Sequence, residues 1–186
     1  MELKHLIVGP LLTNCYILIS KGEALVLDPG GGLKKILKEI GEAKLKYIVL
    51  THHHWDHVSE ALKLKEKTGA KILTNLKEND EIKVGVGDST IVLKVISTPG
   101  HTKESICLLA KDFIFTGDTL FEDGHGRTDL PGGSQKDLEG SLSKLKKILK
   151  PGFKIFPGHG PPFKKPAWKR HFFNLEWEND AKIPYY

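Results

Sequence analysis

The segment Thr51–His57, with the sequence THHHWDH, constrains the fold more than any other part of the chain. It directly follows the apolar run YIVL at 47–50, which predicts a strand. In an extended chain, residues i and i+2 point the same way, so His52 and His54 can hold one metal ion while His53 turns aside. Because a packed core cannot accommodate this cluster without a ligand, the segment predicts a metal site at the end of the strand.

Further side chains of ligand type lie beyond this pair of histidines. Where the chain bends into the next predicted helix, Asp56 and His57 can face a second ion. Three more candidate ligands follow later strands, each in a turn rich in Gly, Pro or Asp: His101 in STPGHT, Asp118 in FTGDTLF and His159 in FPGHGPP. One histidine near a turn is usually a surface or capping residue, but strand ends that converge on one rim would bring all three together. The pattern therefore predicts a site for two ions.

Strands and helices alternate along the chain. Short apolar runs between breakers predict strands at 5–8, 15–19, 24–28, 47–50, 71–74, 82–84, 90–97, 105–110, 113–117 and 153–156. Apolar residues at helical spacing predict helices at 33–40, at 58–68, from an N-cap at Ser134 to 149, and in the aromatic-rich tail at 166–180. Two packed sheets with helices outside, in one domain, would satisfy this order.

The composition argues against several classes of protein. The net charge is +5, yet only two of the 28 basic residues are Arg, the better bidentate phosphate ligand, so we expect no nucleic-acid partner. Cys15 and Cys107 lie in apolar stretches without CxxC spacing, which favours buried small side chains over ligands or a disulfide. No apolar run approaches the roughly 18 residues that cross a bilayer. We therefore expect a cytoplasmic protein with no membrane partner; the oligomeric state stays open.

The motifs THHHWDH, PGHT, GDTLF and PGHG, in this order and each after an apolar strand, resemble those of the metallo-β-lactamase superfamily, specifically its glyoxalase II-like branch. The resemblance covers essentially the whole chain. It implies an α/β fold, the αββα sandwich, as a single domain over residues 1–186, with the site at the edge between two sheets. Classical glyoxalase II has a separate C-terminal helical domain that contacts glutathione, whereas this chain has only residues 160–186 there. The thiol carrier and the acyl group are therefore open.

The resemblance also assigns the metal ligands. It gives the first ion to His52, His54 and His101, the second ion to Asp56, His57 and His159, and Asp118 to both. A carboxylate suits the shared position because its two oxygens can hold ions about 3.5–4 Å apart. This set of imidazoles and carboxylates suits two divalent ions, with zinc expected and iron or manganese chemically acceptable.

Two residues outside the ligand set have two interpretations each. The resemblance would make Asp28, at the end of the strand LVLD, a residue that orients a ligand or Thr51, whereas the local sequence also fits an Asx-turn before Pro29. Arg127 could bind a substrate carboxylate, or it could pair with Asp129 and rigidify its own loop. The sequence does not separate these alternatives.

The ligand set and the resemblance together favour a hydrolase. Two ions that share a water would lower its pKa towards about 7, and Asp56 could orient that water or accept its proton. The expected reaction is cleavage of a small-molecule 2-hydroxyacyl thioester, such as S-lactoylglutathione, by attack of a metal-bound hydroxide. The run GHGRTDLPGG at 124–133 also resembles persulfide dioxygenases of the same superfamily. The alternative is therefore an iron-dependent persulfide dioxygenase, with one iron on His52, His101 and Asp118.

Overall fold

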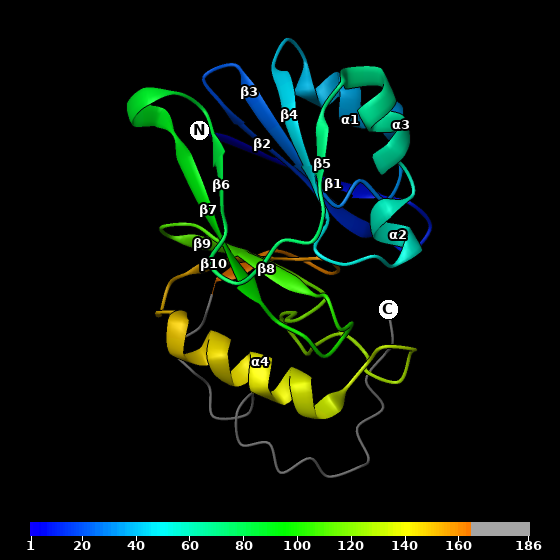
Figure 1. The fold of residues 1–186 in the computed structure, drawn as a ribbon, viewed down its shortest axis with the longest axis vertical. Coiled ribbons are helices and arrows are strands. Elements are labelled where there is room, and N and C mark those ends of the chain that lie inside the picture. Colours follow the sequence, from blue (N-terminus) through cyan, green and yellow to red (C-terminus); the bar gives the residue numbers. More distant parts are fainter. Residues whose placement is uncertain (165–186) are drawn as a thin grey trace.

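The computed structural model describes residues 1–164 as two β-sheets packed face to face between two layers of helix. In Figure 1, helices α1 and α3 cover the first sheet on one side and α4 covers the second sheet on the other. This is the αββα sandwich that the sequence predicts, and the prediction is confirmed. The helix expected at 166–180 lies outside the described residues.

The first sheet has the strand order β1-β2-β3-β4-β5. Its strands are β1 (Glu2–Val8), β2 (Thr13–Ser20), β3 (Glu23–Leu27), β4 (Lys44–Val49) and β5 (Lys71–Leu73). The β1–β2 and β2–β3 pairs are antiparallel, and β4 runs parallel to both β3 and β5. The carboxyl ends of the parallel strands β3 and β4 therefore meet at the same edge of the sheet.

The second sheet has the order β11-β10-β9-β8-β7-β6. Its strands are β6 (Glu81–Val84), β7 (Ile91–Ser97), β8 (Ile106–Leu109), β9 (Phe113–Gly117), β10 (Lys154–Pro157) and β11 (Phe163–Lys164). Only β9 and β10 are parallel, and the helix between them supplies the crossover that a parallel pair needs. The short edge strand β11 has no counterpart among the predicted strands.

Four α-helices and one 3-10 turn complete the described part of the chain: α1 (Leu33–Ile40), α2 (Trp55–Val58), α3 (Ala61–Thr68), η1 (Gly87–Ser89) and α4 (Gln135–Ile148). The N-cap of α4 is Ser134, as predicted, and its side chain accepts a hydrogen bond from the amide of Asp137. None of these helices has the length and apolar character needed to span a lipid bilayer.

Three apolar clusters join the layers. One fills the space between the two sheets, the second lies between the first sheet and α1 and α3, and the third lies between the second sheet and α4. Burial of this apolar surface is the main stabilising contribution to the sandwich. Cys15 and Cys107 are fully buried in the second and third clusters, and both are free thiols.

The predicted helix at 58–68 ends as expected at Thr68, before Gly69, but its start is wrong, because α3 begins only at Ala61 and the separate short helix α2 ends at Val58. The amide of Glu60 donates to the carbonyl of Pro29 at 3.0 Å instead of continuing the α2 ladder. The turn after β3 also presses closely on α2, since a side chain at Gly30 would collide with the carbonyl oxygen of Asp56. Packing between distant segments therefore ends α2 early, and it places Asp56 and His57 on a short helix of their own.

Candidate metal centre

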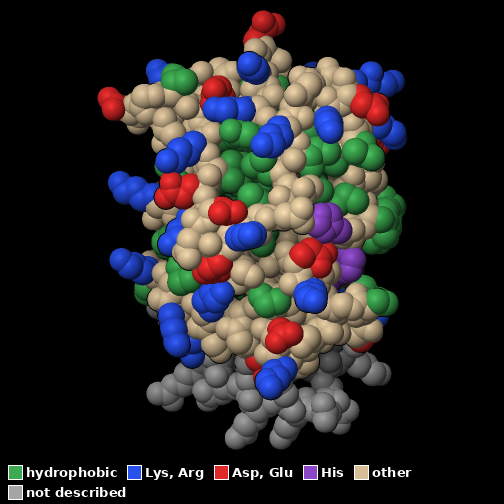
Figure 2. Space-filling model, in the orientation of Figure 1, with side chains coloured by type: hydrophobic (Ala, Val, Ile, Leu, Met, Phe, Trp, Pro, Cys, Tyr) green, Lys and Arg blue, Asp and Glu red, His purple; other side chains and the backbone are tan. Residues whose placement is uncertain are grey.

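The ends of strands from both sheets meet at one edge of the sandwich. His52 and His54 follow β4, and α2 carries Asp56 and His57 directly afterwards. The second sheet contributes the three other predicted ligands, which follow β7, β9 and β10: His101, Asp118 and His159. Histidine and acidic side chains reach the surface together on one flank of the molecule (Figure 2). All seven predicted ligand residues are therefore brought to one place.

These side chains form three overlapping groups of possible ligands, within each of which the ligand atoms lie no more than 4.8 Å apart. The groups are His52, His54 and His101; His52, His57 and Asp118; and Asp56, His57 and His159. The first and third groups share no residue, and each offers three ligand atoms. The described residues are therefore compatible with a binuclear metal site.

Asp118 lies between the two outer groups. One of its oxygens, Oδ2, is 3.5 Å from Nε2 of His101 and 3.6 Å from Nε2 of His159. The other oxygen, Oδ1, is 3.4 Å from Nε2 of His57. A carboxylate that faces ligands of both groups can bridge two cations and reduce the repulsion between them.

Two buried atoms at this centre identify it as a place for cations. Within residues 1–164, Nε2 of His52 and Oδ1 of Asp118 have no hydrogen-bond partner. Leaving a buried polar atom unsatisfied costs about 1–3 kcal/mol, and more for a charged group. A bound divalent ion would satisfy both atoms, so the residues present fit a metal.

The electrostatics of the ligand set fit the same interpretation. Burial and the neighbouring histidines lower the pKa of His52, which therefore stays neutral and able to donate a lone pair. Burial lowers the pKa of His57 too, but the carboxylates of Asp118 and Asp28 outweigh it and raise that pKa to about 9. Burial raises the pKa of Asp56, but the hydrogen bond with His159, the charge of His57 and the hydrogen bond from Thr13 together outweigh it, lower that pKa and keep this group ionised. Metal binding at the second position would therefore release a proton.

Comparison with known proteins assigns this centre to a family. The model of the metallo-beta-lactamase superfamily matches residues 8–83 and 76–159, a span that includes all seven predicted ligands. The chain belongs to the metallo-beta-lactamase superfamily.

Three similar proteins place it more closely. The chain is 36% identical to the hydroxyacylglutathione hydrolase of Pelagibacter ubique, over 77% of this chain and 65% of that protein. Among solved structures, ETHE1 from Myxococcus xanthus has a TM-score of 0.78 with 29% identity, covering 88% of this chain and 80% of that one. TTHA1623 in a di-iron-bound form has a TM-score of 0.76 with 26% identity, covering 87% of this chain and 94% of that one. These similarities support the glyoxalase II-like branch.

In this site, Asp28 contacts Thr51, which directly precedes the predicted ligand His52, and His57, which is itself a predicted ligand. Its Oδ1 accepts a hydrogen bond from the amide of Thr51 at 2.7 Å, and its Oδ2 accepts one from the Thr51 hydroxyl at 2.7 Å. The same Oδ2 lies 3.0 Å from Nδ1 of His57. A carboxylate at Nδ1 fixes the tautomer that presents Nε2 to a metal. Of the two interpretations of Asp28, the geometry favours the orienting role.

Replacing Asp28 with asparagine is expected to weaken metal binding at the second position by about 10–100-fold. Asp28 has a positive φ of 51°, which asparagine tolerates, so the substitution removes the charge without adding backbone strain. The measurement is a metal titration against a chromophoric chelator. Asp80→Asn is the matched control, because within residues 1–164 that carboxylate accepts a hydrogen bond only from a local turn amide, Lys77 N. Equal metal affinity in both variants would reduce Asp28 to a turn residue.

Arg127 takes part in the site through its backbone. Its guanidinium pairs with Asp129, with Nε–Oδ1 at 2.7 Å and Nη2–Oδ2 at 2.6 Å. Its carbonyl oxygen lies 2.7 Å from Nδ1 of His101, which directs Nε2 of that ring towards Asp118. The internal pairing, one of the two predicted alternatives, is the one present, and Arg127 thereby fixes the loop that orients a ligand.

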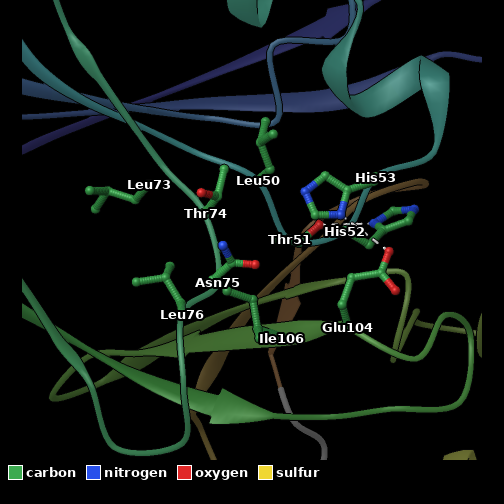
Figure 3. Close-up of a pocket in the computed structure, with 10 residues that line it drawn as sticks. All are labelled: Leu50, Thr51, His52, His53, Leu73, Thr74, Asn75, Leu76, Glu104 and Ile106. Carbon is green, nitrogen blue, oxygen red and sulfur yellow. Dashed lines mark hydrogen bonds and ion pairs between the residues drawn. The ribbon is translucent and has the colours of Figure 1, made fainter.

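A shallow pocket lies beside the metal centre (Figure 3). Its walls are the segment after β4, the end of β5 with the segment that follows it, and the first residue of β8 with the turn before it: Leu50, Thr51, His52, His53, Leu73, Thr74, Asn75, Leu76, Glu104 and Ile106. His53 does turn aside from the other histidines, as predicted, and its Nδ1 lies 3.2 Å from Oε1 of Glu104.

The residues of β2 that support this centre were not among the predicted site residues. The hydroxyl of Thr13 donates to Asp56, the amide of Asn14 donates to the loop that carries His159, and the hydroxyl of Tyr16 donates to the same loop. Asn14, directly before the apolar run 15–19, was the available signal, because a polar side chain that is buried with such a run needs a partner. The sequence did not show that the partners lie more than 140 residues away.

Proposed function

We propose that the protein is a binuclear metallohydrolase that cleaves a small 2-hydroxyacyl thioester such as S-lactoylglutathione. The observation that carries the proposal is the position of Asp118 between two groups of three ligand residues, with its carboxylate within 3.6 Å of imidazole nitrogens of both groups. A mononuclear site would need only one of these groups.

In this proposal the ligands divide as the sequence predicts. His52, His54 and His101 would hold the first ion; Asp56, His57 and His159 would hold the second; and Asp118 would hold both. Two such ions supply an acidified water at neutral pH and polarise the thioester carbonyl. The expected metal is zinc, although the di-iron form of TTHA1623 makes iron a real alternative.

Asp56 has a second duty in the proposed reaction. Its Oδ2 accepts the Thr13 hydroxyl and faces His159, so Oδ1 is the oxygen that we assign to orienting the attacking water and accepting its proton. The leaving group needs little help from the protein, because a thiol has a pKa of about 8.5 and departs readily as a thiolate. One carboxylate is therefore sufficient for the proton transfer.

The thioester class is supported by the similarity to the hydroxyacylglutathione hydrolase of Pelagibacter ubique. The similarity to ETHE1 supports the alternative, an iron-dependent persulfide dioxygenase that would use His52, His101 and Asp118 for one iron. The two reactions differ in their need for the second metal position.

The deciding experiment measures both reactions on the same zinc-loaded and iron-loaded preparations. Thiol release from S-lactoylglutathione and oxygen uptake with glutathione persulfide are followed for the wild type and for His159→Ala. A hydrolase should release thiol, consume no oxygen and lose activity in the variant. Oxygen uptake by the iron form, retained in His159→Ala, with negligible thioester cleavage, would establish the alternative.

A further inference from the structure

The start of β2 makes a direct contact with the second group of ligands. Thr13 is the first residue of the strand and is fully buried. Its Oγ1 donates to Oδ2 of Asp56 at 2.8 Å, the same oxygen that lies 3.2 Å from Nε2 of His159 and 3.3 Å from Nε2 of His57. The hydroxyl therefore fixes the orientation of a carboxylate that has to face an ion.

The next residue, Asn14, holds the loop that carries His159. Its Nδ2 donates to the carbonyl of Pro157 at 2.9 Å and to the carbonyl of Gly160 at 2.7 Å, so it spans that histidine from both sides. Two carbonyls can only accept, which fixes which end of the side-chain amide faces them. The Oδ1 atom lies 2.7 Å from Nε2 of His5, and the whole side chain is buried.

The loop has little freedom to adjust by itself. The backbone amide of Asn14 donates to the carbonyl of Gly158 at 2.7 Å, and the Tyr16 hydroxyl donates to the carbonyl of Pro157 at 2.8 Å. A side chain at Gly158 would collide with Oδ1 of Asp118 and would lie 2.8 Å from Cε1 of His57. The loop thus lies directly against the ligands, and β2 determines where it lies.

The two metal positions differ in their contacts with β2. The second position combines α2, which follows the first sheet, with a loop of the second sheet, and β2 contacts both parts through side chains. Both outer histidines face a backbone carbonyl through Nδ1, that of Arg127 for His101 and that of Leu11 for His159, but among the described residues the side-chain hydrogen bonds from β2 reach only the second position. Support from β2 therefore acts on one metal position and not on the other.

We propose that Thr13 and Asn14 are positioning residues that set the affinity of the second metal position. This inference rests on the binuclear part of the proposed function. The hydroxyl of Thr13 orients Asp56, and the side-chain amide of Asn14 fixes His159. By controlling whether the second position fills, these two residues control whether the centre is binuclear.

The test is a zinc titration of the metal-free full-length chain against a chromophoric chelator, without substrate, which gives a Kd for each position. Thr13→Val removes the hydroxyl at nearly constant shape, and Asn14→Asp removes the donor to both carbonyls. We expect each substitution to weaken the second position by about 10–100-fold and to leave the first unchanged. Thr13→Ser, which keeps the hydroxyl, is expected to restore wild-type binding.

Ser20→Ala is the matched control. Ser20 lies on the same strand, is buried and donates one hydrogen bond to a carbonyl, that of Ser89, away from the metal centre. It is expected to lower the melting temperature of the metal-free chain without changing either Kd. If Thr13→Val and Asn14→Asp lower both affinities equally, or behave as Ser20→Ala does, the positioning role is wrong.

The outcome also separates this inference from the proposed reaction. Two zinc ions in the wild type with a selective loss in the variants supports the inference even if no thioester is cleaved. An unchanged Kd for the second position in Thr13→Val and Asn14→Asp overturns the inference and leaves the hydrolase proposal standing. A single bound ion in the wild type overturns both.

Discussion

Replacing Asp118 with alanine is expected to weaken both metal positions and to lower kcat by more than about 100-fold. The carboxylate lies within 3.6 Å of three imidazole nitrogens, on His57, His101 and His159, and it is the shared ligand of the proposed centre. Loss of a residue that only orients a ligand already costs about 10–100-fold, so loss of the bridge should cost more. The measurement is elemental analysis of the purified variant together with thiol release under saturating substrate.

Substitutions of other predicted ligands provide the comparison for Asp118→Ala, because each should empty mainly one metal position. His101→Ala is expected mainly to empty the first position and His159→Ala the second, whereas Asp118→Ala should empty both. Asp112→Ala is the matched control, because Asp112 is an exposed residue in the turn before β9. One metal ion per chain in fully active wild type, with no change in His159→Ala, would contradict the binuclear assignment.

Much of the fold follows from local patterns in the sequence. The apolar runs predict ten strands close to their observed positions, and the helical spacing predicts α1 and α4, because both patterns depend on residues near each other in the chain. The break between α2 and α3 could not be predicted, since it depends on the close approach of Gly30 to the carbonyl of Asp56 and on the hydrogen bond from Glu60 to Pro29. The edge strand β11 is too short to give a pattern.

The candidate site likewise has residues that could be predicted from the sequence and residues that could not. The ligand residues could be named from the sequence because they are chemically distinctive and each follows a strand. The residues that hold them could not, because Thr13 and Asn14 occur in a strand whose neighbours are apolar and whose partners lie far along the chain. The role of the Arg127 carbonyl could not be predicted either, since every residue has a backbone carbonyl and its contacts leave no pattern in the sequence.

Replacing Asp56 with asparagine is expected to lower kcat per bound metal by about 100-fold or more, because general base catalysis contributes typically 10²–10⁴-fold. Asparagine keeps an oxygen that can contact an ion and can still accept the Thr13 hydroxyl, but it cannot accept a proton from water. The loss of activity should therefore exceed the loss of metal. The measurement is kcat and metal content on the same preparation, repeated with added zinc until the content stops rising.

His159→Ala provides the comparison, since that residue faces Asp56 Oδ2 at 3.2 Å and has no proposed part in proton transfer. In that variant, added zinc should recover activity in proportion to the metal that rebinds. In Asp56→Asn, refilling the second position should leave most of the defect in place, because the missing function is proton acceptance at Oδ1. If activity per bound metal returns to the wild-type value, Asp56 serves only as a ligand, and another group must accept the proton.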